Sequence, residues 1–344
     1  MNSIECIDAT IHFRRPDRVP VDLHNFLPAA RATGKPFPEV FRDGALLAEA
    51  MLAAWREFGH DMILLENGSA CNAEACGATV TYMDNNTAVL SHPALLRELQ
   101  DVQKLEVPDP YKAFPMCEML KATRILAKET AGKVWICARA DQGPMDLAAQ
   151  LRGLDNLMLD IATEEEPKLI HALLDYCRRV GTRYAFALIE CGGHSTNIGE
   201  AIAGPDLIGP KNYRKYPWKH QKRMIKELNA SGIIVHNHIC GRTLPIIDDF
   251  IATGAQVLEI DHKTDLGSIK EKVRGKTTLL GNIDTGLLYS STPAKVEAAC
   301  REAIQIMAPQ GGFILGPGCA LGPDTPAENI HALVESAKKY GRYP

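Results

Sequence analysis

The sequence predicts an α/β protein built as a (β/α)8 TIM barrel. Short apolar runs alternate with helix-length amphipathic stretches along the whole chain, which is the pattern of βα units around a parallel sheet. Eight such runs in 344 residues give roughly 43 residues for each unit, which suits a barrel with insertions. The competing fold is a doubly wound open sheet. Its dinucleotide fingerprint is missing, because the glycine-rich stretch 316–322 has one residue too many and follows the last strand.

The elements follow in chain order. The predicted strands lie at 18–23, 61–66, 134–139, 194–199, 233–239, 257–260, 278–282 and 313–315. Helices are predicted between them at 44–58, 165–188, 213–229, 243–252 and 293–307, with 326–340 closing the chain. The helix at 293 has a Ser-Thr cap followed by proline at its first position, and glycines 232 and 254 end two others.

One domain is expected over 1–344, with its longest insertion at about 67–133. The insertion is predicted to hold a hairpin, formed by 78–83 and 87–91, and a loop rich in Pro and Asp at 107–115. The sequence shows no linker, low-complexity segment or repeat that would mark a second domain.

Composition excludes several classes of function. Thirty-eight basic and 42 acidic side chains give a net charge of −4, which argues against a nucleic-acid-binding surface. No apolar run approaches the length of a membrane span, and residues 1–18 lack the apolar core of a signal peptide. A cytoplasmic location is expected, with the ten cysteines reduced and most of them buried as small hydrophobic residues.

Polar side chains end successive strands, where the active sites of this fold lie. The fifth strand finishes with His236, His238 and Cys240 at alternate positions, so these three share a face. The sixth strand ends at Asp261, and the eighth runs into Cys319. A packed, hydrogen-bonded barrel interior is the ordinary explanation for a lone His-x-Cys, but a third ligand from another strand end favours a metal.

Two thiolates and one imidazole favour Zn²⁺ over Mg²⁺ or Ca²⁺. The wide separation of Cys240 and Cys319 is unlike a zinc finger, in which close ligands are paired. Three protein ligands leave a fourth position for substrate or an exchangeable side chain, as in catalytic zinc sites. The sequence therefore predicts a zinc centre at the carboxyl ends of the strands, held by His238, Cys240 and Cys319.

The chain resembles the uroporphyrinogen decarboxylase superfamily over essentially its whole length. The resemblance rests on 233–241 ending His-Ile-Cys-Gly, on 257–266, on Gly-Asn-Ile-Asp at 281–284 and on Gly-Pro-Met-Asp-Leu-Ala at 143–148. The decarboxylases carry an arginine-rich N-terminal motif for the substrate carboxylates, whereas residues 21–28 here contain no arginine. Together with the His-x-Cys and the late Cys, this resembles the zinc-dependent, corrinoid-linked methyltransferase branch.

The resemblance implies a ligand set and a partner. In that branch the zinc ligands match His238, Cys240 and Cys319. By comparison with cobalamin-independent methionine synthases, the fourth ligand matches Asp261, with Glu259 as the weaker option; Asp261 could equally orient His238. The chain lacks a cobalamin signature of the Asp-x-His-x-x-Gly type, so the corrinoid is expected on a separate protein that docks over the barrel mouth, with loops 26–38 and 107–115 as candidate surfaces.

Further polar groups follow the other strands and form the rest of the expected site. Glu200 and Asp141 are the predicted catalytic residues, as sources of a proton or hydrogen bond. The predicted substrate-binding residues are His24, Asn25, Phe26, Glu66, Asn67, Gln142, His236 and Asn282.

The expected activity is methyl transfer from a small donor, an aryl methyl ether, to the Co(I) corrinoid of a partner protein. An apolar wall at Phe26 beside polar groups at His24 and Asn25 suits an aromatic ring with oxygen substituents. The alternative is a methylcobalamin:thiol (coenzyme M-type) enzyme, which calls for a cation such as Arg139 or Arg242 to hold a sulfonate. A second alternative is uroporphyrinogen decarboxylase itself. A homodimer is also expected.

Overall fold

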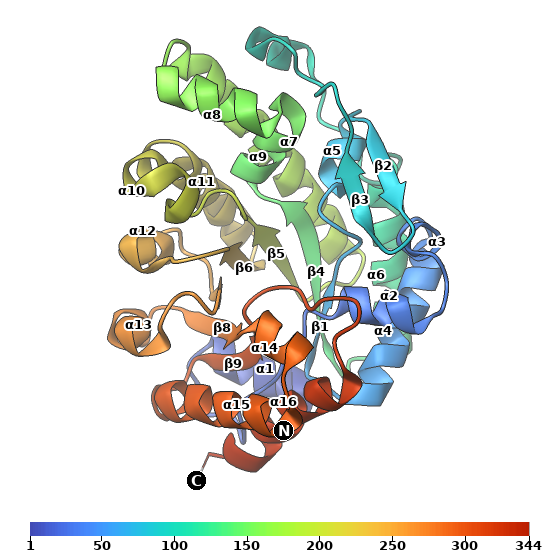
Figure 1. The fold of residues 1–344 in the computed structure, drawn as a ribbon, viewed down its shortest axis with the longest axis vertical. Coiled ribbons are helices and arrows are strands. Elements are labelled where there is room, and N and C mark those ends of the chain that lie inside the picture. The colour runs from blue at the N-terminus through green and yellow to red at the C-terminus, as the bar shows by residue number, and fades with distance from the viewer. Residues whose placement is uncertain (344) are drawn as a thin grey trace.

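The computed structural model describes residues 1–343 and contains a curled, seven-stranded parallel sheet (Figure 1). Each strand pairs with the next in the order β1, β4, β5, β6, β7, β8, β9. Their bounds are Met62–Leu65, Trp135–Gln142, Ser195–Gly199, Ile234–Ile239, Val257–Ile260, Thr278–Ile283 and Phe313–Pro317. These seven strands confirm the predicted ones from 61–66 onward to within a few residues.

The segment around Val21 joins the two edges of this sheet. The Asp22 N–H donates to the Leu315 carbonyl at 3.0 Å, and the Met62 N–H donates to the Val21 carbonyl at 3.2 Å. The predicted strand 18–23 is therefore present only as isolated bridges. Those at Val21 and Asp22 are parallel and link β9 to β1, and the one at Arg18 is antiparallel, to Arg342. Pro20, which has no N–H to donate, limits its length. With this segment the sheet closes as the eight-stranded barrel expected.

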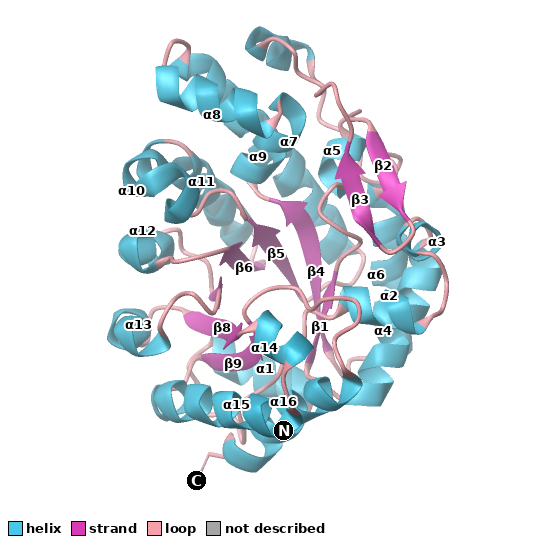
Figure 2. Cartoon of the chain, in the orientation of Figure 1, coloured by secondary structure: helices cyan, strands magenta, loops and turns pink. Residues whose placement is uncertain are grey.

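Helices surround the barrel (Figure 2). They are α1 Ser3–Ile11, α2 Phe26–Ala32, α3 Phe37–Phe41, α4 Gly44–Phe58, α5 Cys71–Ala75, α6 Met116–Thr130, α7 Pro144–Arg152, α8 Leu154–Thr163, α9 Pro167–Glu190, α10 Pro205–Lys215, α11 Pro217–Ala230, α12 Ile247–Ile251, α13 Leu266–Val273, α14 Thr285–Ser290, α15 Pro293–Met307 and α16 Ala327–Tyr340, with 3₁₀ turns at Leu99–Lys104, Leu244–Ile246 and Ala308–Gln310. Within residues 1–343, none of these helices combines the length and apolar character that crossing a membrane requires.

Two local predictions are wrong for reasons involving proline. The predicted helix 213–229 is split at Tyr216, because Pro217 starts a new helix and disfavours helical geometry in the residue before it. The predicted loop 26–38 contains α2 and the start of α3. Pro28 and Pro38 lie in first turns, where a missing N–H removes no helical hydrogen bond.

The segment between β1 and β4 holds the predicted hairpin. Strands β2 (Val80–Met83) and β3 (Asn86–Leu90) pair antiparallel beside α3, which confirms that part of the interpretation. Residues 107–115 form turns and loop, as expected.

The hydrophobic core has two parts. The larger part fills the space between the sheet and the helices. The smaller part lies inside the barrel at the amino ends of the strands, where Ile7 and Ile11 of α1 pack onto inward-facing strand residues. These strand residues are Met62, Leu64, Trp135, Cys137, Val257, Leu280 and Ile314. Helix α1 therefore closes one end of the barrel with apolar side chains and leaves the carboxyl ends for a site.

Candidate metal centre

Three side chains converge at the carboxyl ends of β6 and β9. The ligand atoms of His238, Cys240 and Cys319 lie within 4.8 Å of one another, with His238 Nε2 at 3.2 Å from Cys240 Sγ. The strand's alternation places His238 and Cys240 on the same face, and Cys319 lies two residues after the end of β9. Within residues 1–343 this is the one group of three or more His, Cys, Asp or Glu side chains with metal-binding geometry.

The backbone of β7 fixes the imidazole. His238 lies opposite Glu259 in the sheet register, and its Nδ1–H donates to the Glu259 carbonyl at 3.1 Å. A carbonyl can only accept, so Nδ1 carries a proton, and Nε2 is the nitrogen that faces the two sulfurs. Metal-binding histidines are commonly held in this way.

The pKa values of the two cysteine thiols are shifted in opposite directions. A hydrogen bond from Cys240 and another from His238 lower the pKa of Cys319 to about 4. The pKa of Cys240 is raised by the same hydrogen bond and by burial. A half-buried thiolate beside an orientated imidazole and a second thiol is the donor set that Zn²⁺ prefers, so these residues fit that metal.

The two candidates for a fourth ligand are engaged elsewhere. Asp261 accepts hydrogen bonds from the backbone N–H groups of Gly241 at 2.8 Å and Lys263 at 3.0 Å, which fixes the loops after β6 and β7. The Glu259 carboxylate accepts from His24 at 3.0 Å and Asn197 at 2.9 Å. The residue that orients His238 is Glu259, through its carbonyl, and not Asp261, because Glu259 is its register partner.

A buried network of charges lies beneath the three ligands. His24 contacts Glu66 at 2.9 Å and Glu259 at 3.0 Å, and Arg139 pairs with Glu66 at 3.0 Å. Burial alone would lower the pKa of His24, but Glu259 and Glu66 together raise it to about 10. His24 and Arg139 thus balance two carboxylates, and the interior of the barrel is held close to neutral.

Asp141 and Gln142 end β4 next to this network. Asp141 accepts from the Asn72 N–H at 2.8 Å and from Gln142 Nε2 at 3.1 Å. Burial raises the pKa of the Asp141 carboxyl to about 7. Its φ of 63° is in the left-handed region, a strained conformation for a non-glycine residue that is found more often at functional sites.

Glu200 lies against the first turn of α7. Its carboxylate accepts from the N–H groups of Met145 at 3.1 Å and Asp146 at 3.0 Å and from Gln221 Nε2 at 3.1 Å. Burial, together with the nearby Asp146, raises the pKa of Glu200 to about 8. These contacts hold the loop after β5 against α7, so Glu200 positions that loop.

The other predicted site residues are spread over the carboxyl end of the barrel. Asn25 and Phe26 start α2, where Phe26 is buried 5.9 Å from the His24 ring, and Asn67 is half-buried after β1. His236 is buried two residues before His238. Asn282 donates from Nδ2 to the Thr264 carbonyl at 2.8 Å and so joins β8 to the loop after β7.

Two polar residues near the site were missed from sequence. Asn197, at an inward position of β5, donates to Glu259, and Asp146 accepts from the N–H groups of Ala201 at 2.8 Å and Ile202 at 2.9 Å. The signal for Asn197 was present, because the alternation of β5 places it on the same face as Ser195. Asp146 lies in the Gly-Pro-Met-Asp stretch, and no sequence pattern there predicts its contacts.

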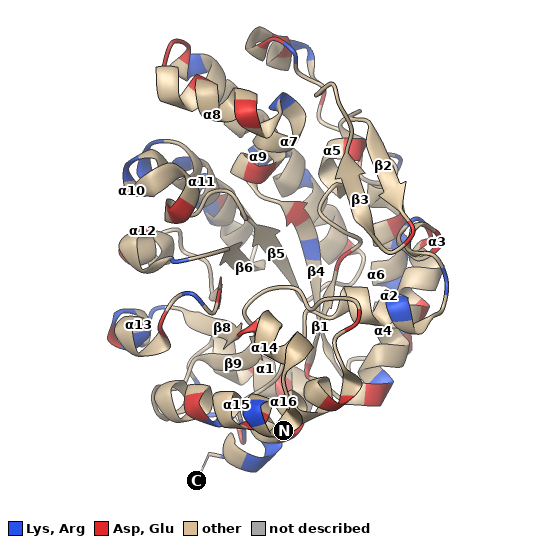
Figure 3. Ribbon diagram, in the orientation of Figure 1, with Lys and Arg blue, Asp and Glu red and all other residues tan. Residues whose placement is uncertain are grey.

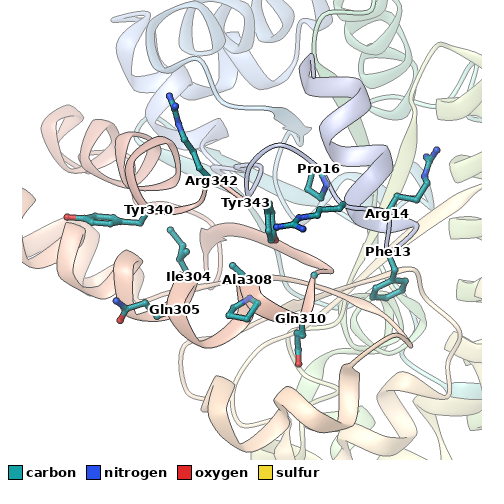
Figure 4. A pocket seen from close by; sticks show the side chains of 13 residues that line it. Phe13, Arg14, Pro16, Ile304, Gln305, Ala308, Gln310, Tyr340, Arg342 and Tyr343 are labelled. Atoms are coloured by element: carbon teal, nitrogen blue, oxygen red, sulfur yellow. The ribbon is translucent and has the colours of Figure 1, made fainter.

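A cavity of substantial size lies away from these residues. It measures about 580 Å³ and lies between the loop after α1, the 3₁₀ turn after α15 and the segment from Tyr340 to Tyr343 (Figure 4). These segments flank the amino ends of the strands, at the opposite end of the barrel from His238, Cys240 and Cys319. Over the rest of the molecule, acidic and basic positions are interspersed on the outer helices, and both signs occur within β4 (Figure 3).

Comparison with known proteins assigns the family. The model of the uroporphyrinogen decarboxylase (URO-D) family matches residues 4–340. The chain belongs to this family. It is 28% identical over 320 residues to the methylcobamide:CoM methyltransferase MtbA of Methanosarcina acetivorans, covering 90% of this chain and 88% of the relative. It is 24% identical over 353 residues to the uroporphyrinogen decarboxylase of Magnetococcus marinus, covering 96% and 95%.

Solved structures support the fold. A methyltransferase from Methanosarcina mazei superimposes with a TM-score of 0.89 at 24% identity, covering 99% of both chains. A B12-independent methionine synthase from Shewanella superimposes with a TM-score of 0.60 at 13% identity, covering 94% of this chain and 98% of the other. The URO-D-like barrel predicted from the sequence is confirmed.

Proposed function

We propose that this chain is a zinc-dependent methyltransferase that transfers a methyl group between a small substrate and the corrinoid of a partner protein. The observation that carries the proposal is the convergence of His238, Cys240 and Cys319 within 4.8 Å. The names of two relatives agree with it, since MtbA and MtaA of Methanosarcina are methylcobamide:CoM methyltransferases at 28% and 25% identity.

The chain's own residues have distinct tasks in this proposal. His238, Cys240 and Cys319 hold the metal, and the Glu259 carbonyl sets the imidazole. Zinc in such a site supplies Lewis acidity, either to an ether oxygen or to a thiol. Asp141, whose carboxyl has a pKa raised to about 7 by burial, is the proposed proton donor, and Glu200 positions α7. Asp261 remains a candidate for the fourth ligand only if its loop contacts rearrange.

The proposed methyl donor is an uncharged aryl methyl ether. A sulfonated thiol would need a free cation, but Arg139 pairs with Glu66 and Arg242 pairs with Asp206, each at 3.0 Å. In the donor reaction the electron pair of Co(I) forms the cobalt–carbon bond, and the carbon–oxygen pair leaves on the phenolate. The phenolate then takes one proton, so that Co(I), ether and proton give methyl-Co(III) and phenol.

The relatives' names favour a second candidate, transfer from methylcobamide to a thiol. In that direction the thiol sulfur supplies the electron pair for the new carbon–sulfur bond, Co(I) departs with the cobalt–carbon pair, and the thiol proton is released. The decarboxylase alternative has less support, because residues 21–28 carry no arginine for a polycarboxylate.

Metal analysis tests the centre. The purified protein should hold about one zinc, and Cys319→Ala should retain less than about a tenth of it, since two ligands from one strand do not hold zinc tightly. Cys300→Ala is the matched control, because Cys300 is buried in α15, outside the cluster. Full zinc occupancy in Cys319→Ala would refute the assignment.

A methyl-transfer assay tests the direction. The zinc-loaded protein is mixed with cob(I)alamin and a panel of methoxyarenes, methylamines and methylthiols, and methyl-Co(III) is followed by absorbance. Methylation by a methoxyarene supports the proposal. No methylation from any donor, together with demethylation of methylcobalamin by a thiol, would establish the second candidate.

A further inference from the structure

The cavity of about 580 Å³ at the amino ends of the strands has no part in the proposed function. Its walls come from the loop after α1, from the 3₁₀ turn after α15 and from the segment that follows α16. Backbone hydrogen bonds join the first and last of these walls. The Val19 N–H donates to the Gly341 carbonyl at 2.9 Å, and the Tyr343 N–H donates to the Asp17 carbonyl at 3.1 Å. Paired backbone therefore holds the cavity in shape.

An exposed aromatic ring forms part of the lining. Phe13 is 39% exposed, and its φ of 53° lies in the left-handed region, which is rare for a bulky side chain. Its ring packs on Gly312, where a Cβ would come within 2.5 Å of Phe13 Cε1. A strained backbone and a glycine thus hold an apolar ring at the cavity, and strain of this kind is found more often at ligand-binding sites.

A second part of the lining presents a cation. The guanidinium carbon of Arg15 lies 5.9 Å from the centre of the Tyr343 ring, in a cation–π arrangement. The Arg15 side chain is exposed, and within residues 1–343 it makes no ion pair and no hydrogen bond, so its N–H donors are open to a ligand. Arg14, by contrast, pairs with Asp8, and Figure 4 shows Arg14 and Arg342 extending away from the cavity.

The chemistry of the lining selects a flat ring that carries an anionic group. Thirteen of the described residues line the cavity, and none of these is acidic. The rings of Phe13 and Tyr343 offer apolar, aromatic surface, and a guanidinium group binds phosphate through paired N–H donors. A volume of about 580 Å³ is within the range of small-molecule sites, so the cavity can hold a ring and an anionic group together.

We propose that this cavity is a second ligand site, which binds a nucleotide with its base against Phe13 and its phosphate on Arg15. The site lies at the other end of the barrel from His238, Cys240 and Cys319, so the nucleotide takes no part in methyl transfer. The inference therefore goes beyond the proposed function and does not depend on it.

Calorimetric titration of the zinc-loaded protein with adenosine monophosphate (AMP), adenosine and inorganic phosphate tests this. The wild-type protein should bind AMP at least about tenfold more tightly than either part alone, because only AMP makes both the ring contact and the charged hydrogen bonds. Arg15→Leu should weaken AMP binding at least about tenfold and leave adenosine binding within about twofold. The matched control is Arg301→Leu, since Arg301 also lies 5.9 Å over a tyrosine ring but does not line the cavity, and it should keep the affinity for AMP.

A second variant tests the cavity itself. Ala308 lines it from the 3₁₀ turn, so Ala308→Phe should fill part of the space and weaken binding of both AMP and adenosine at least about tenfold. An unchanged zinc content would show that this variant is folded. Equal affinity of the wild-type protein for AMP and adenosine, or AMP binding that is unchanged in Arg15→Leu or in Ala308→Phe, would overturn the inference.

Titration of the metal-free protein separates this site from the metal centre. The affinity for AMP should stay within about twofold after a chelator removes zinc, because distant sites act independently. AMP binding that disappears with the zinc would place the nucleotide at the metal centre, and it would overturn the inference while leaving the proposed function intact. Absence of zinc from the purified wild-type protein would overturn the proposed function, and the titration would still test the cavity.

Discussion

The two ends of the barrel interior are built by the same strands but have opposite chemistry. Along β4 the inward positions begin with Trp135 and Cys137 in the smaller apolar core covered by α1, here called the plug, and continue with Arg139 in the charged network. Along β7 they pass from Val257 to Glu259. One alternating pattern therefore supplies a dry, apolar base near the amino ends and a polar, metal-competent site at the carboxyl ends, as stability and function divide in this fold.

Asp22 marks the boundary between the two regions. It is fully buried in the segment that closes the barrel, and within residues 1–343 neither of its carboxylate oxygens has a hydrogen-bond partner. Burial raises its pKa to about 7. The polar half thus tolerates ionised groups only where they are paired, as His24, Glu66 and Arg139 are.

The largest loss of stability is expected from breaking an ion pair in the polar region at the carboxyl ends of the strands. Arg139→Met removes the cation that pairs with Glu66 and leaves a buried carboxylate without it, which should lower the free energy of unfolding by about 3–5 kcal/mol. Chemical denaturation measures this. Adding Glu66→Leu should recover part of the loss, because both partners are then gone. A double variant as unstable as the sum of its singles would contradict the pairing.

A substitution in the apolar region should lower the free energy of unfolding by less, and it should leave the zinc content unchanged. Ile7→Ala in α1 removes a fully buried side chain from the plug and should cost about 3 kcal/mol. Ile4→Ala on the same helix is the control, since Ile4 is only partly buried and should cost clearly less. Zinc content should stay at about one in both variants. Loss of zinc from Ile7→Ala would show that the two ends are not separable.

The strands and the convergence of the three candidate ligands were open to prediction because they depend on local rules, whereas the plug was not predicted, because no helix was expected at residues 3–11. The apolar runs predicted the seven strands. The alternation of side chains along β6 and the order of the strands predicted that His238, Cys240 and Cys319 lie close together. The network of His24 with Glu259, which is 235 residues away, depends on barrel closure and on register, which no local pattern contains. Helix α2 was missed because Pro28 indicates a loop unless its place in the first turn is known.

A moderate, pH-dependent effect is expected from His60, which lies just before β1. It is buried, and burial lowers its pKa to about 4. The unfolded chain takes up a proton below about pH 6.5, whereas the folded protein does not until about pH 4. This contribution to stability is therefore complete above pH 6.5 and is lost as the pH falls, by about 2 kcal/mol at pH 5.

His60→Leu isolates that effect. The variant cannot bind the proton in either state, so the difference in unfolding free energy between it and the wild type should grow in the variant's favour from pH 7 to pH 5. Denaturation at both pH values measures the difference, and other titrating groups cancel in the comparison. A difference independent of pH would mean that His60 is solvated in the folded protein.

The smallest effect is expected at the exposed rim. Arg242 is 71% exposed and pairs with Asp206 at 3.0 Å, so Arg242→Ala should change the free energy of unfolding by less than about 1 kcal/mol. If the donor is an uncharged aryl ether, its KM should also stay within about twofold. If the enzyme instead uses a sulfonated thiol held by this guanidinium, the KM for that thiol should rise at least about tenfold, because a charged hydrogen bond is lost. Measuring KM for both substrates therefore shows whether Arg242 contacts the substrate or only lies at the edge of the site.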